Sequence, residues 1–190
     1  MKHISLYCIL AMIFISLTVA GCSTTNVEQS KLEFEITGVI PPGYHRMTIQ
    51  EIEQMIGIPL PVPGYLPYGL KIEEVYAYQI PNTIPTQTAV LILISDVPVA
   101  RRDSQYTCQL ALEIGWNEAG LGLKMIDAEL IPEIEGRLQK NDDQLILWWE
   151  SYGSPDSLGS TLRLHADLKF LLDEMVGIAS STPSLATQSP

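Results

Sequence analysis

The sequence predicts one α+β domain: a mostly antiparallel sheet of about six strands, with a short N-terminal helix and a C-terminal amphipathic helix packed on it. Three observations lead to this fold class. Apolar stretches of strand length recur between turns, a helix-start signal stands at Thr48, and apolar residues repeat at helical spacing after Asp167. The 190 residues, 46% of them hydrophobic, are enough for a single core.

The strand candidates come in series along the middle of the chain. They cover residues 70–80, 88–96, 106–116, 123–135, 144–151 and 161–167. Turn residues bound each stretch, and the separations are too short for crossover helices. The pattern therefore favours antiparallel hairpins.

Two helices are expected to flank these strands. Thr48-Ile49-Gln50-Glu51 has the form of a capping box, and Gly57 is placed to end the helix that follows. Asp167 is a candidate N-cap for a closing helix. That helix would present an apolar stripe of Leu168, Leu171, Leu172, Met175, Val176 and Ala179.

A proline-rich segment, residues 59–69, separates the first helix from the first strand. Proline lacks the backbone donor that helices and central strands require. We therefore expect this segment to run extended over the surface before it enters the sheet.

The first 21 residues are interpreted as a signal peptide. Lys2 precedes an uncharged run over residues 4–20, which is slightly short for a membrane-spanning helix. Val19-Ala20-Gly21-Cys22 resembles the lipobox of bacterial lipoproteins, in which the cysteine thiol receives a diacylglycerol and the chain is cleaved before it. The resemblance implies a lipidated Cys22 that anchors the chain to a bacterial membrane, with the domain outside the cytoplasm. An ordinary secretory peptide, an uncleaved anchor and a buried helix are the alternatives.

Composition divides the remainder of the chain into three parts. Residues 22–44 are expected to form a tether, with a candidate edge strand at 31–36, and residues 45–180 the single α+β domain. Residues 181–190 are rich in Ser, Thr and Pro and carry no charge, which predicts a disordered tail.

The step Tyr65-Leu66-Pro67-Tyr68-Gly69, between the capping-box helix and the strand after it, resembles an uncharacterised bacterial extracytoplasmic domain family of unknown function. The likeness spans roughly residues 48–181. It implies a folded sensor or binding domain of the kind found in lipoproteins and anti-sigma-factor-like proteins. It carries no catalytic residue to this chain.

Charge argues against a nucleic-acid-binding protein, and cysteine content leaves a single thiol in the mature chain. The 11 Lys and Arg against 22 Asp and Glu give a net charge of −11, which disfavours nucleic acid as a partner. Of the three cysteines, Cys8 would leave with the signal peptide and Cys22 would carry lipid. Cys108 would then be a lone thiol, expected to be a buried structural residue.

No recognisable active site stands out in the sequence. Phosphate-binding loops, nucleophile elbows and zinc-ligand spacings are missing, so no catalytic residue, metal ligand or cofactor is expected. Arg163, His165 and Asp167 alternate with apolar residues, which predicts a solvated strand face. Glu133 and Glu135 would share one strand face.

The aromatic residues are the candidate contacts for a ligand or partner: Tyr65, Tyr68, Tyr76, Tyr78, Trp148 and Trp149. Strand alternation places Trp148 and Trp149 on opposite faces, and core packing is the alternative role for these side chains. The preferred hypothesis is a non-enzymatic lipoprotein domain that binds an unknown protein or hydrophobic ligand, or senses envelope conditions. The alternatives are a carrier that holds a lipid between sheet and helix, and a cell-wall hydrolase that uses carboxylates.

Overall fold

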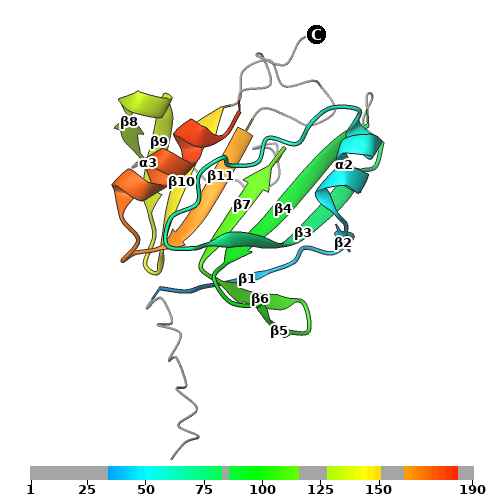
Figure 1. The fold of residues 1–190 in the computed structure, drawn as a ribbon, viewed down its shortest axis with the longest axis horizontal. Helices are drawn as coiled ribbons and strands as arrows, with labels where there is room; N and C mark the ends of the chain where they lie inside the picture. The colour runs from blue at the N-terminus through cyan, green and yellow to red at the C-terminus, as the bar shows by residue number, and fades with distance from the viewer. Residues whose placement is uncertain (1–33, 83–85, 116–127, 151–160, 184–190) are drawn as a thin grey trace, which may run out of the picture. The chain divides into compact units, whose positions relative to one another are not determined.

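The computed structural model describes residues 34–82, 86–115, 128–150 and 161–183 of this protein (Figure 1). Two α-helices and a mostly antiparallel sheet confirm the α+β class. The estimate of about six strands in one sheet is wrong, because an eight-stranded sheet is accompanied by a second sheet of three strands.

All neighbouring strands in both sheets are antiparallel. The eight-stranded sheet has the order β2 (His45–Arg46), β3 (Lys71–Ile80), β4 (Gln87–Ser95), β7 (Leu110–Ile114), β11 (Thr161–Asp167), β10 (Gln144–Glu150), β9 (Gly136–Lys140) and β8 (Glu129–Ile131). The small sheet has the order β1 (Ile36–Val39), β6 (Gln105–Cys108) and β5 (Ala100–Arg102). The helices are α2 (Ile49–Ile56), α3 (Leu172–Ser181) and the short 3-10 helix η2 (Pro132–Ile134).

The strand predicted at 106–116 is split at Gln109. This residue is buried, and its side-chain oxygen accepts from the backbone N–H of Asp96 and from the Ser95 hydroxyl. The Gln109 side chain is hydrogen-bonded to residues at and just after the end of β4, and the strand is interrupted at this residue. The residues before it form β6 of the small sheet, and those after it form β7 of the large sheet. Residue 116 lies outside the described residues.

Of the strand predicted at 123–135, residues 128–135 are described, and they contain β8 and η2 of a hairpin instead of one continuous strand. Pro132 opens η2, and Glu135 takes the left-handed conformation, so the chain reverses into β9. Gly136 begins β9 where a Cβ atom would lie 2.6 Å from the carbonyl oxygen of Trp148, so only glycine fits. Glu133 and Glu135 therefore do not share a strand face.

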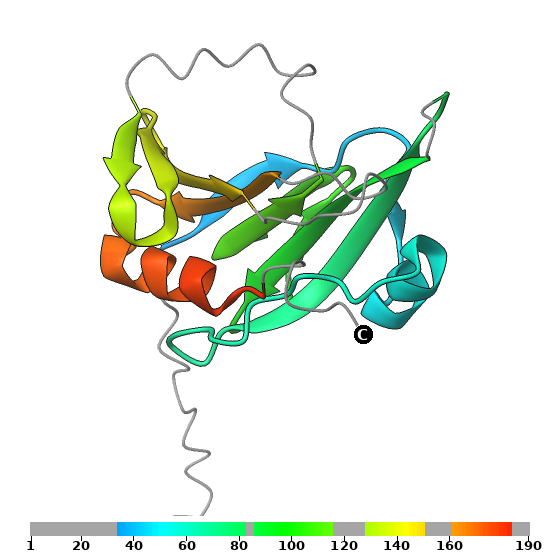
Figure 2. The same ribbon diagram turned by 90° about the horizontal axis from the view of Figure 1, so that it is seen from above.

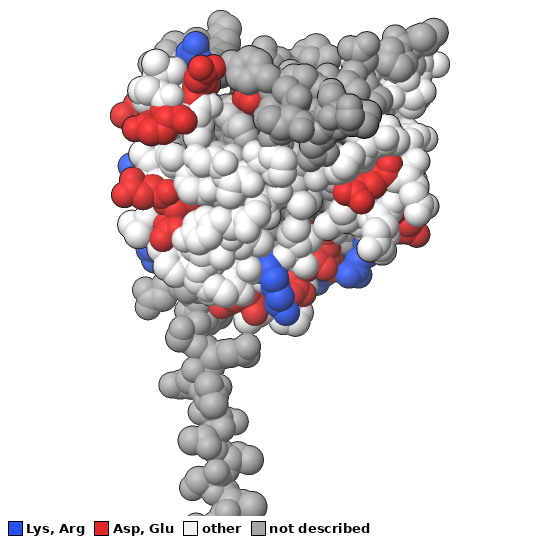
Figure 3. All heavy atoms as spheres, turned by 45° about the horizontal axis from the view of Figure 1, so that its top comes forward, with Lys and Arg blue, Asp and Glu red and all other residues white. Residues whose placement is uncertain are grey.

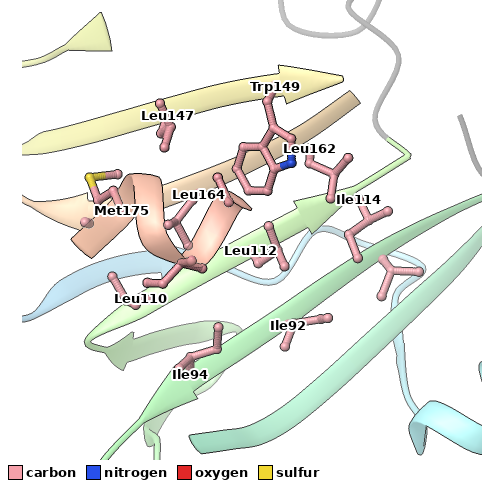
Figure 4. Close-up of a cluster of buried hydrophobic side chains, with 14 of the residues drawn as sticks. Ile92, Ile94, Leu110, Leu112, Ile114, Leu147, Trp149, Leu162, Leu164 and Met175 are labelled. Atoms are coloured by element: carbon pink, nitrogen blue, oxygen red, sulfur yellow. The ribbon is translucent and has the colours of Figure 1, made fainter. Parts of the chain in front are cut away.

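One face of the large sheet is covered by α2, α3 and residues 57–70, which cross it between the two helices (Figures 1 and 2). The predicted capping box is confirmed, since Glu51 N–H donates to Thr48 and Thr48 N–H donates to Glu51. The proline-rich segment is extended, and it is bound to α3 because Gly64 N–H donates to the Ser181 carbonyl at 3.2 Å. The main core lies beneath this cover and includes Ile92, Ile94, Leu110, Leu112, Leu147, Trp149, Leu164 and Met175 (Figure 4).

The closing helix begins later than predicted. Asp167 does not cap it; its carboxylate accepts from Lys169 N–H at 2.8 Å and its carbonyl accepts from Phe170 N–H, which makes a turn. The α3 helix starts at Leu172, and its buried residues are Met175, Ile178 and Ala179. Leu168 and Leu171, expected on the apolar stripe, are instead exposed in the turn.

The opposite face of the large sheet is covered by the small sheet. Its strand β1 falls within the segment predicted as a tether with an edge strand. A second core forms here from Ile36, Tyr76, Leu91, Leu93, Tyr106, Cys108 and Ala111. The Cys108 thiol is buried and donates to the Leu110 carbonyl, which confirms a structural cysteine. Within the described ranges, no helix is long and apolar enough to cross a membrane.

The central position of β7 leads to a stability prediction. Leu112→Ala should lower the free energy of unfolding by about 2–5 kcal/mol, because Leu112 is fully buried and its truncation leaves a cavity. Urea denaturation followed by circular dichroism measures this change. Leu130→Ala is the matched control, since Leu130 is 60% exposed and the change should stay within about 0.5 kcal/mol. Equal losses in the two variants would contradict the core described here.

Candidate functional site: a polar cluster and an aromatic corner

The six aromatic candidates do not form one surface. Trp148 and Trp149 lie on opposite faces of β10 as predicted, and both are buried, with 6% and 7% of their surface exposed. Tyr76 is also buried, whereas Tyr65 and Tyr68 are 43% and 45% exposed. Cys22, the predicted lipidation site, lies outside the described residues.

The two tyrosines of β3 serve the small-sheet side of the fold. The Tyr76 hydroxyl donates to Glu74 at 2.8 Å, and Arg101 lies 4.8 Å above the Tyr76 ring. Tyr78 stacks on Tyr44 with ring centroids 5.6 Å apart. These contacts connect elements of the fold; Tyr76 is buried among them, and Tyr78 is partly buried.

A buried polar cluster crosses the same face of the sheet and was not predicted. It consists of Glu113, Arg163, His165, Gln144 and Trp148. The register aligns three of them, because Arg163 stands opposite Glu113 on one side and opposite Trp148 on the other. Arg163 is 2% exposed and His165 is half-buried, so the prediction of a solvated face for this strand is wrong.

The contacts within the polar cluster converge on Glu113. Its carboxylate lies 3.0 Å from the Arg163 guanidinium and 3.6 Å from Nε2 of His165. The guanidinium also lies 4.8 Å above the Trp148 ring, a cation–π geometry. On the far side of the imidazole, Nδ1 is 3.4 Å from the side-chain oxygen of Gln144.

The lowered pKa of Glu113 agrees with an ion pair between Glu113 and Arg163. Burial raises the pKa of the Glu113 carboxyl, but the adjacent His165 imidazole and the charge of Arg163 outweigh it, so this pKa lies below its usual range. The carboxylate is committed to Arg163 and His165, and the imidazole is held between Glu113 and Gln144. The arrangement suits the joining of strands β7, β10 and β11 better than proton transfer to a substrate.

An aromatic corner forms where the described chain begins. The rings of Phe34, Tyr68 and Phe170 meet edge to face, with centroids 5.0–6.0 Å apart. Tyr65 lies beside them, and its hydroxyl donates to Glu174 at 2.6 Å, which raises the pKa of Tyr65. This corner therefore joins the start of the described chain, the proline-rich segment and the start of α3.

The ion pair generates a pH prediction. Glu113→Gln should lower the free energy of unfolding at pH 7 by about 3–5 kcal/mol, because it removes the carboxylate paired with buried Arg163. A lowered pKa stabilises the fold above the carboxyl's unfolded value, and this contribution is lost as pH falls through the folded value. The difference between wild type and variant should therefore shrink below about pH 4.

Urea denaturation at pH 7 and at pH 3 measures the free energy of unfolding of wild type and of Glu113→Gln at each pH. Glu129→Gln, at an exposed position on β8, serves as the control and should change stability by less than about 0.5 kcal/mol at either pH. An effect of Glu113→Gln that is equally large at both pH values would argue against an ionised Glu113.

The buried Cys108 thiol generates a prediction about its reactivity. Burial raises the pKa of Cys108 to about 12, so the thiolate is scarce at pH 8. A thiol reagent should leave Cys108 unmodified in the folded domain and modify it after guanidinium unfolding. Rapid labelling of the folded protein at Cys108, located by peptide mass mapping, would contradict this burial.

Comparisons with protein-family models, with curated proteins and with solved structures find no significant match to this chain. The likeness to an extracytoplasmic domain family therefore stays a prediction.

Proposed function

We propose that this chain is a membrane-anchored extracytoplasmic lipoprotein with a non-catalytic binding or envelope-sensing domain. The observation that carries the proposal is the apolar leader that ends in Val19-Ala20-Gly21-Cys22, a short distance ahead of a folded unit. Only residues 23–33, which are 11 residues, separate Cys22 from Phe34. Two or three acyl chains would hold such a domain stably at a bilayer, whereas one chain binds marginally.

The described side chains favour binding over catalysis. The most chemically varied group, the polar cluster, has its carboxylate and imidazole engaged with each other and with Arg163 and Gln144. The exposed aromatic side chains of Tyr65 and Tyr68 lie at the corner, where they offer contact area for a partner.

The other two hypotheses find less support. A lipid carrier needs space between the sheet and its helices, but Met175 and Ile178 of α3 are fully buried in one cluster with Leu164 and Trp149. A carboxylate-dependent hydrolase needs two facing acids, and Glu133 and Glu135 lie instead on and after the turn of η2.

The test is the intact mass of the full chain purified from bacterial membranes. We expect a mass that fits cleavage before Cys22 plus two or three acyl chains. Cys22→Ser should lose both changes, because the thiol that receives the lipid is gone. Cys8→Ser is the matched control and should leave the mass of the processed chain unchanged, because residue 8 is removed with the signal peptide. A wild-type chain that keeps residues 1–21, or that carries no lipid, would overturn the proposal.

A further inference from the structure

The strongest unexplained surface of the described chain is an exposed apolar patch at the aromatic corner. We define this docking patch as Tyr65, Tyr68, Leu168 and Leu171, which are 43%, 45%, 37% and 59% exposed. Phe170 lies in the same turn as the two leucines and contacts Tyr68. Leu171 precedes Glu174 by one helical turn, and Glu174 accepts from Tyr65. Tyr65 and Tyr68 therefore lie beside the segment that carries Leu168 and Leu171.

We propose that the docking patch lies against the lipid bilayer to which the chain is anchored. This inference rests on the proposed lipid anchor at Cys22 and names the partner of the exposed tyrosines. Three features of the molecule support a bilayer as the occupant: where the chain enters the domain, how charge is distributed, and which residue types form the patch.

The entry point of the chain is at the patch itself. The first described residue, Phe34, packs edge to face on Tyr68 and on Phe170. Figures 1 and 2 both place the beginning of β1 beside the turn that precedes α3. From Cys22 to Phe34 the chain spans at most about 43 Å when fully extended. An anchor at Cys22 therefore keeps the patch close to the membrane, at an effective concentration on the order of mM.

The charge distribution fits an anionic lipid surface. The chain carries a net charge of −11, yet residues 54–70 and 175–183 contain no Asp, Glu, Lys, Arg or His. These stretches form the proline-rich segment and most of α3. Figure 3 views this side obliquely and shows acidic groups at the margins of a broad uncharged area. Asp167, Lys169, Asp173 and Glu174 flank Leu168 and Leu171, so the uncharged part of the patch is its Tyr65 and Tyr68 side. An acidic surface turned toward anionic headgroups would be repelled, which favours this side.

The residue types match the interfacial layer of a bilayer. Tyrosine prefers the level of the headgroups, where its ring meets apolar chains and its hydroxyl stays with polar groups. The Tyr65 hydroxyl already donates to Glu174, so this polar group has a partner when the ring enters the interface. Leu168 and Leu171 supply the aliphatic contact.

The experiment uses a chain in which a histidine tag replaces residues 1–21 and Cys22 is changed to Ser. Residues Leu32–Pro190 form a compact unit of their own, so removal of the leader leaves both cores intact. The tag binds nickel-chelating lipid in vesicles of phosphatidylethanolamine and phosphatidylglycerol. This attachment does not depend on acylation in the cell.

A bimane fluorophore on Leu171→Cys reports contact with lipid, and the same label on Leu130→Cys is the matched control. Both positions are exposed, and Leu130 lies on β8, outside the four residues of the docking patch. Because Cys108 is buried, the introduced cysteine is the thiol that reacts. Nitroxide-labelled lipid should quench the label at position 171 at least about threefold more strongly than at position 130.

Two further variants test the patch rather than the label. Leu168→Ser removes an exposed contact and should reduce quenching at position 171 with an unchanged near-ultraviolet spectrum. Tyr68→Ser should reduce it further, although it also disturbs the packing of Phe34. Equal quenching at positions 171 and 130 would overturn the docking proposal. If the intact-mass test then shows that Cys22 of the wild-type chain is acylated, the proposed anchor still stands. Strong quenching at position 171, together with an unmodified Cys22 in the intact-mass test, would support docking and overturn the anchor.

Discussion

The fold depends on covering both faces of its four central strands. Every residue of β4 from Thr88 to Ser95 is buried, and β7, β11 and β10 are nearly as enclosed. Since side chains alternate between the two faces of a strand, such burial requires a layer on each side. The helices and the proline-rich segment supply one layer, and the small sheet supplies the other. The second layer consists partly of residues 36–39, so the stretch that follows the predicted anchor is part of the fold.

Enclosure of the second face explains the polar cluster. A strand such as β11 would be stable with Arg163 and His165 in water, but beneath the small sheet these groups must find partners. The register provides them, because Glu113 and Trp148 flank Arg163 on the neighbouring strands. A buried pair of this kind adds little net stability compared with apolar residues. We infer that it disfavours any strand register that leaves Arg163 without Glu113.

Much of the local structure was predictable from sequence, and most of the tertiary cover was not. The capping box at Thr48 and the apolar strands depend on neighbours in the chain, so their signals are local. The alternation in Thr161–Asp167 predicts a half-buried strand. Its polar side is covered by β1, which is distant in sequence, so the local pattern does not indicate this cover. Likewise, Leu168 and Leu171 continue a helical period, but the Asp167 turn sets a later helix start. The exposed Tyr65 and Tyr68 were among the predicted contacts, whereas Glu113 carried no recognisable signal.

One described segment, which follows the predicted anchor in the chain, connects the docking patch to the polar cluster. Phe34 packs into the aromatic corner, and three residues later the Thr37 carbonyl accepts from Gln144 at 3.5 Å, while Gln144 also contacts His165. The entry of the chain is therefore fixed at two points, by aromatic packing and by a polar contact. The packed entry fixes the point at which the chain leaves the domain, so the side around Phe34 is the one nearest the predicted anchor. With the proposed anchor at Cys22, the start of β1 would bring the side of the domain that holds the docking patch nearest to the membrane.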